Sequence, residues 1–514
     1  MSNQIILQPH QQKIVDHMLT HRGLIAVHQT GSGKTIAAVA SIAAIQKQTP
    51  TIQTIVLCPL SVSTQWENEV ARWNLQNVNI YTPQYFMNIM NDDTKRPECT
   101  GIYLIIDEAH NVRTNIIYNI NKDKTIKGHR ASAIMKAASL ASKVLLLTAT
   151  PIINTPFDIY NLVMMVEGTT PEQSIQEKQF HKACIDVDSF NKMFQCKTSF
   201  YSYQTTEKSS EFFPGRINMP ITYIPMTHSY YESYKKIENK QITSELVAAF
   251  ADKVNGDKNK DMCFTILREA INALDGVNSP KIAWVKNFIL SHKNEKTIVF
   301  SNWKEAGMNL VKSVLDEEKI PYVTVEGDAD QEERHTAVQK YNNIEDGVNV
   351  MLITRAGCEG LNFFGTRHVV LMESNWNKST DEQIIGRAIR HGSHTHLPED
   401  QRTVQIHRIM LKKPAGVSDN YDSIDEEIYR SAYKSKDPIC SAFMGRLKEL
   451  SIENKTCECC HTSSLKLSFE TNVFQKSLRK KTNAKTYDGT SYFDFVASSK
   501  NSKNSKKIQK KQTA

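Results

Sequence analysis

The feature that most constrains the fold is an alternation of short apolar runs with helical stretches. In the first part of the chain, four runs of three or four apolar residues alternate with segments such as 35–46 and 131–141, whose composition and spacing indicate helices. Continuous apolar runs are typical of parallel strands buried on both faces. The alternation therefore predicts an open, mostly parallel sheet with helices on both sides. The four runs are 24–27, 55–57, 104–106 and 144–147.

The same alternation returns from about residue 279, so two α/β domains of similar size are expected. We expect an N-terminal domain at 1–165, a connecting, partly helical segment at 166–278, a second domain at 279–450, and a Cys-containing segment with a basic tail at 451–514. The second set of runs is 298–300, 322–325, 348–352 and 368–371, and helices are expected at 230–251, 261–274, 304–317, 331–343, 424–433 and 441–450.

Composition and charge exclude several classes of protein. Hydrophobic residues make up 40% of the 514 residues and charged residues 23%, which suffices to bury a core. The apolar runs are far shorter than the roughly 18 residues of a membrane span. Ten cysteines over this length indicate a reducing, intracellular location and not a secreted disulfide framework. The net charge of +8 lies in the tail, because residues 476–514 hold eleven basic and two acidic residues.

A glycine-rich segment follows the first apolar run and precedes a helix, which is the context of a P-loop. Its glycines let backbone N–H groups surround a phosphate, and the helix start adds partial positive charge. Lys34 would reach the β- and γ-phosphates of ATP, and the Thr35 hydroxyl would ligate Mg²⁺. The alternative is an ordinary turn, which the Lys-Thr pair disfavours. The segment reads His28, Gln29, Thr30, Gly31, Ser32, Gly33, Lys34, Thr35, with His28 where the consensus has Gly.

Two carboxylates directly follow the apolar run at 104–106. Asp107 stands where a parallel sheet places the partner of Mg²⁺, and Glu108 is the candidate general base for the attacking water. Taken alone, the pair could instead begin a surface helix with Asp107 as its N-cap. The preceding buried strand and the P-loop favour the catalytic interpretation.

Further motifs follow in a characteristic order. Residues 148–154 read Thr-Ala-Thr-Pro-Ile-Ile-Asn, 354–362 read Thr-Arg-Ala-Gly-Cys-Glu-Gly-Leu-Asn, and 383–390 read Gln-Ile-Ile-Gly-Arg-Ala-Ile-Arg. With Asp-Glu-Ala-His at 107–110, the chain resembles superfamily 2 helicase-like ATPases of the DEAH-box type. The Trp376-Asn377 spacing is similar to Snf-type DNA translocases and poxvirus-type nucleoside triphosphatases, although Lys378 stands where the Snf type has Pro. The resemblance covers residues 7 to about 430 and implies two tandem RecA-like domains.

The resemblance also implies roles for individual residues. Gln11 would contact adenine, while Gln383, Arg387 and Arg390 would complete the catalytic site from the second domain. An arginine supplied in this way accelerates phosphoryl transfer by about 10³–10⁵. The alternative for the two arginines alone is a solvated helix face.

Nucleic acid would be bound through its phosphate backbone, with little base specificity. The resemblance assigns these contacts to Pro59, Ser301, Thr354 and Arg355, although Pro59 could simply end a strand. The basic tail either binds nucleic acid or is only solvated and disordered. The cluster Cys457, Cys459, Cys460 and His461 lacks the two separated ligand pairs of a zinc finger.

The sequence thus predicts an ATP-dependent nucleic-acid motor that uses ATP and Mg²⁺, with DNA favoured as partner over RNA and no membrane association. Translocation along double-stranded DNA is the first hypothesis, and strand separation of DNA or RNA is the second. The third is a viral-type transcription factor in which ATP binding serves as a switch.

Overall fold

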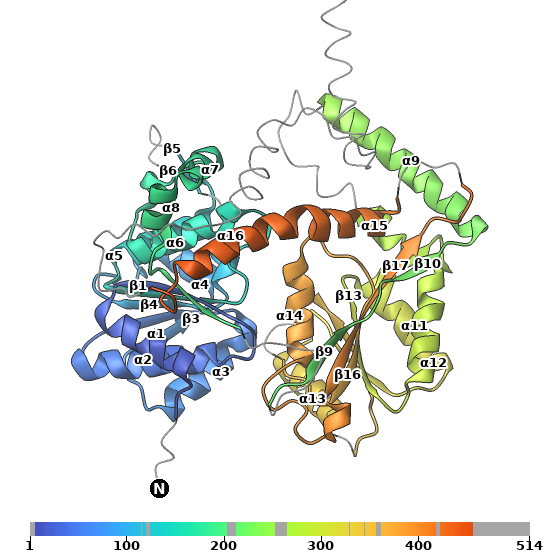
Figure 1. Ribbon diagram of the computed structural model, residues 1–514, viewed down its shortest axis with the longest axis horizontal. Helices are drawn as coiled ribbons and strands as arrows, with labels where there is room; N and C mark the ends of the chain where they lie inside the picture. Colours follow the sequence, from blue (N-terminus) through green and yellow to red (C-terminus); the bar gives the residue numbers. More distant parts are fainter. Residues whose placement is uncertain are drawn as a thin grey trace, which may run out of the picture. The chain divides into compact units, whose positions relative to one another are not determined.

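The computed structural model describes residues 6–114, 116–119, 124–202, 212–251, 265–327, 329–343, 345–355, 361–417 and 422–455. The chain divides into two compact units, which are both α/β (Figure 1). Unit 1 comprises residues 1–204 and 436–483, and unit 2 comprises residues 205–435 and 484–514. The domain boundaries expected from the sequence stay predictions. No helix within the described ranges is long and apolar enough to cross a bilayer.

A six-stranded parallel sheet forms the centre of unit 1, in the order β3-β2-β4-β7-β1-β8. Its four central strands confirm the four apolar runs. The edge strands β3 and β8 were not expected. The strands are β1 (Gly23–His28), β2 (Thr54–Leu57), β3 (Val78–Tyr81), β4 (Tyr103–Ile106), β7 (Lys143–Thr148) and β8 (Thr198–Tyr201).

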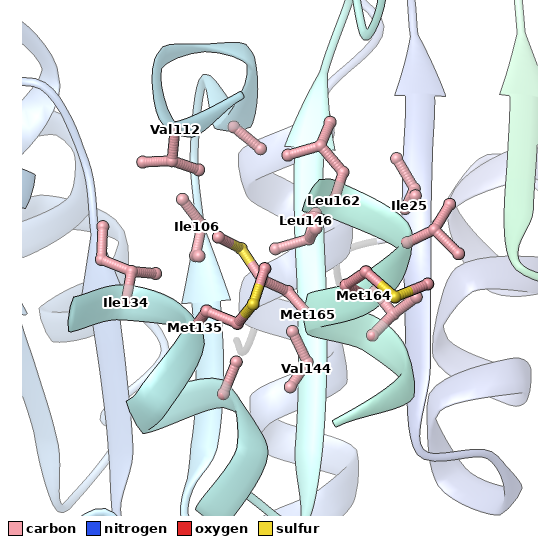
Figure 2. Packing of buried hydrophobic residues seen from close by; sticks show 14 of the residues in the cluster. Ile25, Ile106, Val112, Ile134, Met135, Val144, Leu146, Leu162, Met164 and Met165 are labelled. Atoms are coloured by element: carbon pink, nitrogen blue, oxygen red, sulfur yellow. The ribbon is translucent and has the colours of Figure 1, made fainter. Parts of the chain in front are cut away.

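Helices cover both faces of this sheet because alternate strand residues point to opposite sides. Leu24 and Ala26 pack with α1 (Pro9–Thr20), α2 (Lys34–Gln48) and α3 (Leu60–Arg72). Ile25 and Val27 pack on the other side, where Figure 2 shows Met135 and Met165 against the strands. The helices of that side are α4 (Pro83–Met90), α5 (His129–Leu140), α6 (Tyr160–Glu167), α7 (Glu177–Ile185), α8 (Val187–Phe194) and α16 (Asp437–Glu449).

Unit 2 is built on a second parallel sheet, in the order β10-β17-β16-β13-β15-β14, with β9 also paired to β17. The second set of apolar runs is confirmed as four of these strands. β9 and β10 come from the segment interpreted as connecting, and β17 was not expected. The strands are β9 (Gly215–Asn218), β10 (Thr222–Pro225), β13 (Lys296–Ser301), β14 (Tyr322–Val325), β15 (Val350–Thr354), β16 (Thr366–Leu371) and β17 (Thr403–Lys412).

Figure 1 shows α11 (Pro280–Ser291) and α12 (Asn309–Glu317) on one side of this sheet and α14 (Lys378–Ala388) on the other. Side chains of α11 and α12 share a core with β13, β15, β16 and β17. The remaining helices of unit 2 are α9 (His228–Ala251), α10 (Thr265–Glu269), α13 (Gln331–Asn342) and α15 (Ile424–Tyr429).

The helix expected at 261–274 is wrong over its last residues. The helix α10 ends at Glu269, and β11 (Ala273–Leu274) pairs antiparallel with β12 (Val277–Asn278). Asp275 and Gly276 both have positive φ, at 50° and 75°, which is the conformation of a two-residue Asp-Gly hairpin turn. The preference of Asp275 and Gly276 for a turn therefore outweighs the helical periodicity that predicted a helix up to residue 274. A second small hairpin joins β5 (Ile117–Asn119) to β6 (Lys124–Lys127).

A buried ion pair joins α11 to α15 within unit 2. Lys281 Nζ lies 2.6 Å from Asp425 Oδ2, and both side chains are fully buried. The Asp425 carboxylate also accepts hydrogen bonds from the backbone N–H groups of Ser374 and Leu411. Its charge is therefore compensated on several sides.

Candidate nucleotide and nucleic-acid site

The glycine-rich loop connects β1 to α2, as the sequence predicted. Gly31 and Gly33 have φ of 80° and 77°, a region that L side chains rarely adopt. A Cβ at Gly33 would lie 2.3 Å from Gln11 Nε2. The backbone conformation therefore favours glycine there, and a side chain at this position would also have to displace the Gln11 amide.

The loop offers polar groups for a phosphate. Lys34 Nζ donates to the carbonyl oxygens of His28 at 2.9 Å and Gln29 at 3.4 Å. The buried Ser32 Oγ and Gln29 Oε1 have no hydrogen-bond partner among the described residues. Because buried polar atoms are nearly always paired and a helix start attracts anions, this loop fits nucleotide phosphates. Thr35 follows in the first turn of α2, where its hydroxyl fits the predicted Mg²⁺ ligand.

Gln11 is fixed against the same loop. Its side-chain Nε2 donates to the carbonyl oxygens of Ser32 at 3.2 Å and Gly33 at 3.3 Å. His10 Nε2 lies 2.9 Å from the Ser32 oxygen as well. The structure thus shows Gln11 tying the start of α1 to the loop, and its predicted contact with adenine stays a prediction.

Asp107 stands at the end of β4 with 8% of its surface exposed. Trp66 Nε1 donates to Asp107 Oδ2 at 2.9 Å, and the backbone N–H of Glu108 donates to Oδ1 at 2.9 Å. Burial and the neighbouring Glu108 carboxylate raise the pKa of Asp107, while the Trp66 bond and the Lys34 charge act in the opposite direction. The parallel strands β4 and β1 flank β7 in the sheet, so Asp107 and the loop that holds Lys34 follow the same carboxyl edge, and the two predicted motifs converge in unit 1.

Glu108 adopts φ of 48° and is connected to the Thr148 motif. Glu108 Oε2 lies 3.3 Å from His110 Nδ1, and the same nitrogen lies 3.2 Å from Thr148 Oγ1. The strand β7, which ends at Thr148, lies between β4 and β1 in the sheet. His110 therefore links the candidate base to the strand between the two ATP motifs.

The candidate arginines of unit 2 lie at the end of α14. Arg387 is buried, with 7% exposed, and its Nε has no hydrogen-bond partner among the described residues. Arg390 Nε donates to the Gly386 oxygen at 3.2 Å, and its guanidinium also donates to Asn362. A buried arginine nitrogen that no described residue pairs with fits a group that receives an anion. Gln383 lies one helical turn before Arg387 and is half-buried.

Two residues of the Trp376 to Arg390 segment, Asn377 and Asp381, hold α14 in place. Asn377 caps the helix by accepting from Thr380 N at 3.1 Å. Asp381 is buried and contacts Asn375, Arg408 and Tyr433. Sequence reasoning missed this anchor because β17, which carries Arg408, was not expected.

The predicted nucleic-acid residues lie at the carboxyl ends of strands. Pro59 is the N-cap of α3, two residues after the end of β2. Ser301 and Thr354 are register partners at the ends of β13 and β15, and both are buried. Ser301 Oγ donates to Glu373 at 2.7 Å, whereas Arg355 is exposed. The roles of these four residues stay predictions.

Several sequence features fall outside the described residues. They are residues 356–360 of the 354–362 motif, the Cys457 to His461 cluster and the basic tail.

His28 has a structural role that no sequence pattern revealed. Its Nε2 lies 2.8 Å from Ser199 Oγ in β8, and Ser199 donates to Glu453 Oε1 at 2.6 Å. Burial lowers the pKa of His28 to about 3, so the imidazole is neutral at physiological pH. The residue that replaces the consensus glycine thus joins the loop to the edge strand and to the segment after α16. These contacts span more than 170 residues, which explains why periodicity could not find them.

Comparison with known proteins agrees with this arrangement. Residues 10–275 match the SNF2-related domain, and residues 280–392 match the helicase conserved C-terminal domain. A protein of Acanthamoeba polyphaga mimivirus that is named as an ATP-dependent RNA helicase is 30% identical over 79% of this chain and 88% of its own length.

Two more distant relatives come from other viruses. A termination factor NPH-I homolog of African swine fever virus is 22% identical over 89% of this chain and 80% of its own length. Nucleoside triphosphatase I of Melanoplus sanguinipes entomopoxvirus is 22% identical over 88% of this chain and 80% of its own length. From the matched domains and the two α/β units, the chain belongs to the SNF2-related family of helicase-like ATPases, whose members are ATP-dependent nucleic-acid motors.

Proposed function

We propose that this motor hydrolyses ATP to translocate on double-stranded DNA. The observation that carries the proposal is the convergence of Lys34 and Asp107 in unit 1. The loop holds buried polar atoms that have no hydrogen-bond partner within the described part of the chain, and Asp107 is a buried carboxylate that accepts two hydrogen bonds. Such an arrangement is suited to positioning and charge stabilisation, which supply most of the catalysis of phosphoryl transfer.

Each predicted residue has a defined part in this proposal. The loop N–H groups and Lys34 bind the phosphates, and Thr35 with Asp107 would hold Mg²⁺, which neutralises phosphate charge when bound. Glu108 orients and deprotonates the attacking water, and His110 keeps its carboxylate in place. Arg387 of unit 2, assisted by Arg390 and Gln383, stabilises the charge that develops on the γ-phosphate.

DNA is favoured as partner because Trp376-Asn377 and the 383–390 motif keep the Snf-type spacing, and residues 10–275 match the SNF2-related domain. The exposed Arg355 next to the buried Thr354 suits a contact to phosphate, which fixes register without reading sequence. The intracellular, reducing location expected from the cysteines is part of the same proposal.

The rate of ATP hydrolysis against single- and double-stranded DNA and RNA tests this function. We expect the largest stimulation with double-stranded DNA, and no turnover for Lys34→Ala with any nucleic acid. A triplex-displacement assay beside unwinding of a forked duplex separates translocation from strand separation. Unwinding without triplex displacement would refute the translocase proposal.

A second candidate is an RNA-directed helicase, and it is favoured by the name of the mimivirus relative. Maximal stimulation by RNA together with unwinding of an RNA duplex would support it. The third hypothesis, a transcription factor switched by ATP binding, is supported by the name of the African swine fever virus relative. It predicts almost no turnover with any nucleic acid, which the Glu108 geometry disfavours.

A further inference from the structure

A cluster of imidazole and carboxylate groups lies in unit 2, away from the motifs of the ATP site. His292 follows the end of α11, Glu295 precedes β13, and His368 lies near the start of β16. One ligand atom from each of these three residues lies within 4.8 Å of the others. The predicted nucleic-acid residues Ser301 and Thr354 stand at the opposite, carboxyl ends of the strands. The cluster is therefore a separate feature of the sheet.

We propose that His292, Glu295 and His368 bind a divalent transition-metal ion, with Zn²⁺ as the expected occupant. Two imidazole nitrogens and one carboxylate oxygen are a ligand set that suits Zn²⁺, with water in the fourth position. Donor atoms at about 2.0–2.2 Å from zinc are roughly 3.4 Å apart in a tetrahedral site. Glu295 Oε2 and His368 Nε2 are hydrogen-bonded at 2.9 Å, so these two atoms need to separate slightly while His292 approaches.

The hydrogen bonds around the cluster orient its ligand atoms. His292 Nδ1 lies 2.9 Å from the Phe288 carbonyl oxygen and 3.0 Å from Ser291 Oγ. A proton on Nδ1 satisfies the carbonyl oxygen and leaves the lone pair on Nε2. His368 Nε2 donates to the Glu295 carboxylate at 2.9 Å, so a metal ion would take the place of that proton. His368 Nδ1 lies 3.2 Å from His407 Nε2, which can accept a proton held on Nδ1 when Nε2 ligates the metal. Metal-bound histidines are typically oriented in this way by a carbonyl oxygen or another acceptor on the second nitrogen.

The remaining neighbours are compatible with a bound cation. Arg367 Nε lies 3.9 Å from Glu295 Oε1, whereas Oε2 is the oxygen that faces His368. The carboxylate can therefore contact Arg367 through Oε1 and ligate a metal ion through Oε2. The Lys296 ammonium donates to the Asn342 carbonyl oxygen and so is engaged elsewhere. The Phe288 ring lies 4.3 Å from the His292 ring and 5.3 Å from the His368 ring, measured between centroids. It supplies an apolar neighbour to both imidazole rings, and such surroundings control how solvent reaches a metal site.

The site would join the turn after α11 to β16, two segments more than 70 residues apart in sequence. Bound Zn²⁺ should therefore stabilise unit 2 against unfolding, because a ligand that binds only the folded state raises its stability. The expected stabilisation does not depend on the proposed ATPase function.

Zinc titration of the full chain against a chromogenic chelator tests the proposal. The protein used in this titration carries Cys457→Ser, Cys459→Ser and Cys460→Ser, which remove the thiolate ligands of the Cys457 to His461 cluster. We expect one Zn²⁺ per chain, and a Co²⁺ spectrum without a thiolate charge-transfer band. His292→Gln and Glu295→Gln should each weaken Zn²⁺ binding by about 100-fold or more. His407→Gln, which removes only the outer partner, should weaken it by about 10–100-fold.

His335→Gln is the matched control, because His335 is an exposed histidine on α13 of the same unit. It should bind Zn²⁺ as the parent does, and circular dichroism should confirm that every variant is folded. Absence of Zn²⁺ binding by the Cys-substituted parent would refute the proposal. Equal Zn²⁺ affinity of His292→Gln and the parent would refute it as well.

Discussion

Replacing Trp66 by Phe tests how unit 1 controls the charge of Asp107. The indole N–H donates to Asp107 Oδ2 at 2.9 Å inside the protein, and this bond favours the charged carboxylate. Burial and Glu108 already raise the pKa of Asp107. Removal of the bond should therefore raise that pKa further. Asp107 must be charged to hold Mg²⁺ in the proposed mechanism, so activity should be lost at a higher pH than in the parent.

The size of the effect follows from the strength of the bond. Hydrogen bonds to charged groups contribute about 1.5–3 kcal/mol, and one pKa unit corresponds to about 1.36 kcal/mol. The upper limit is thus a shift of about 1–2 units. Because the neutral carboxyl also loses a weaker bond, we expect a shift of about 1 unit.

The assay is the pH dependence of kcat/KM for ATP hydrolysis at saturating nucleic acid, since kcat/KM reports groups of the free enzyme. Trp73→Phe is the matched control. Trp73 ends the same helix, and its Nε1 has no hydrogen-bond partner among the described residues. An unmoved acidic limb in Trp66→Phe, or an equal shift in Trp73→Phe, would refute the reasoning.

Two further predictions concern the loop and the core. Gly33→Ala should reduce ATP binding at least tenfold, measured by fluorescent nucleotide titration, because the new Cβ would displace the Gln11 amide. Gly101→Ala has similar positive φ with nothing within 4 Å and should leave ATP binding unchanged. Lys281→Met should lower the free energy of unfolding in urea by about 3–5 kcal/mol, because it leaves the Asp425 carboxylate buried without its cation.

Each of these predictions has an outcome that contradicts it. ATP binding by Gly33→Ala equal to that of the parent, or an equal loss in Gly101→Ala, would contradict the first prediction. A loss of less than about 1 kcal/mol in Lys281→Met would show that the Asp425 charge is already compensated by its backbone donors.

The sheet centres could be predicted from the sequence because strands buried on both faces read as continuous apolar runs. The run at 144–147, for example, became β7 (Lys143–Thr148) with one added residue at each end. Edge strands carry no such signal. No residue of β3 is fully buried, and its sequence Val-Asn-Ile-Tyr is half polar. The strand β17 was missed because polar residues such as Gln405 and Arg408 interrupt its apolar positions.

The candidate site likewise contains residues that the sequence predicted and residues that it could not predict. Lys34, Asp107 and Glu108 were found because the chemistry of phosphate binding fixes residue types at short spacing. Trp66 could not be found, because its bond to Asp107 joins residues 41 positions apart and nothing in a helix of ordinary composition marks it. Contacts of this kind depend on the tertiary packing, which the local pattern does not specify.

The most direct test of the central claim is single-turnover ATP hydrolysis by Arg387→Ala with nucleic acid bound. The account predicts that the rate falls by about 10³–10⁵, while ATP affinity changes only a few-fold, because the phosphate loop of unit 1 is intact. Hydrolysis at a rate close to that of the parent would contradict the account, since Arg387 would then have no part in stabilising the transition state.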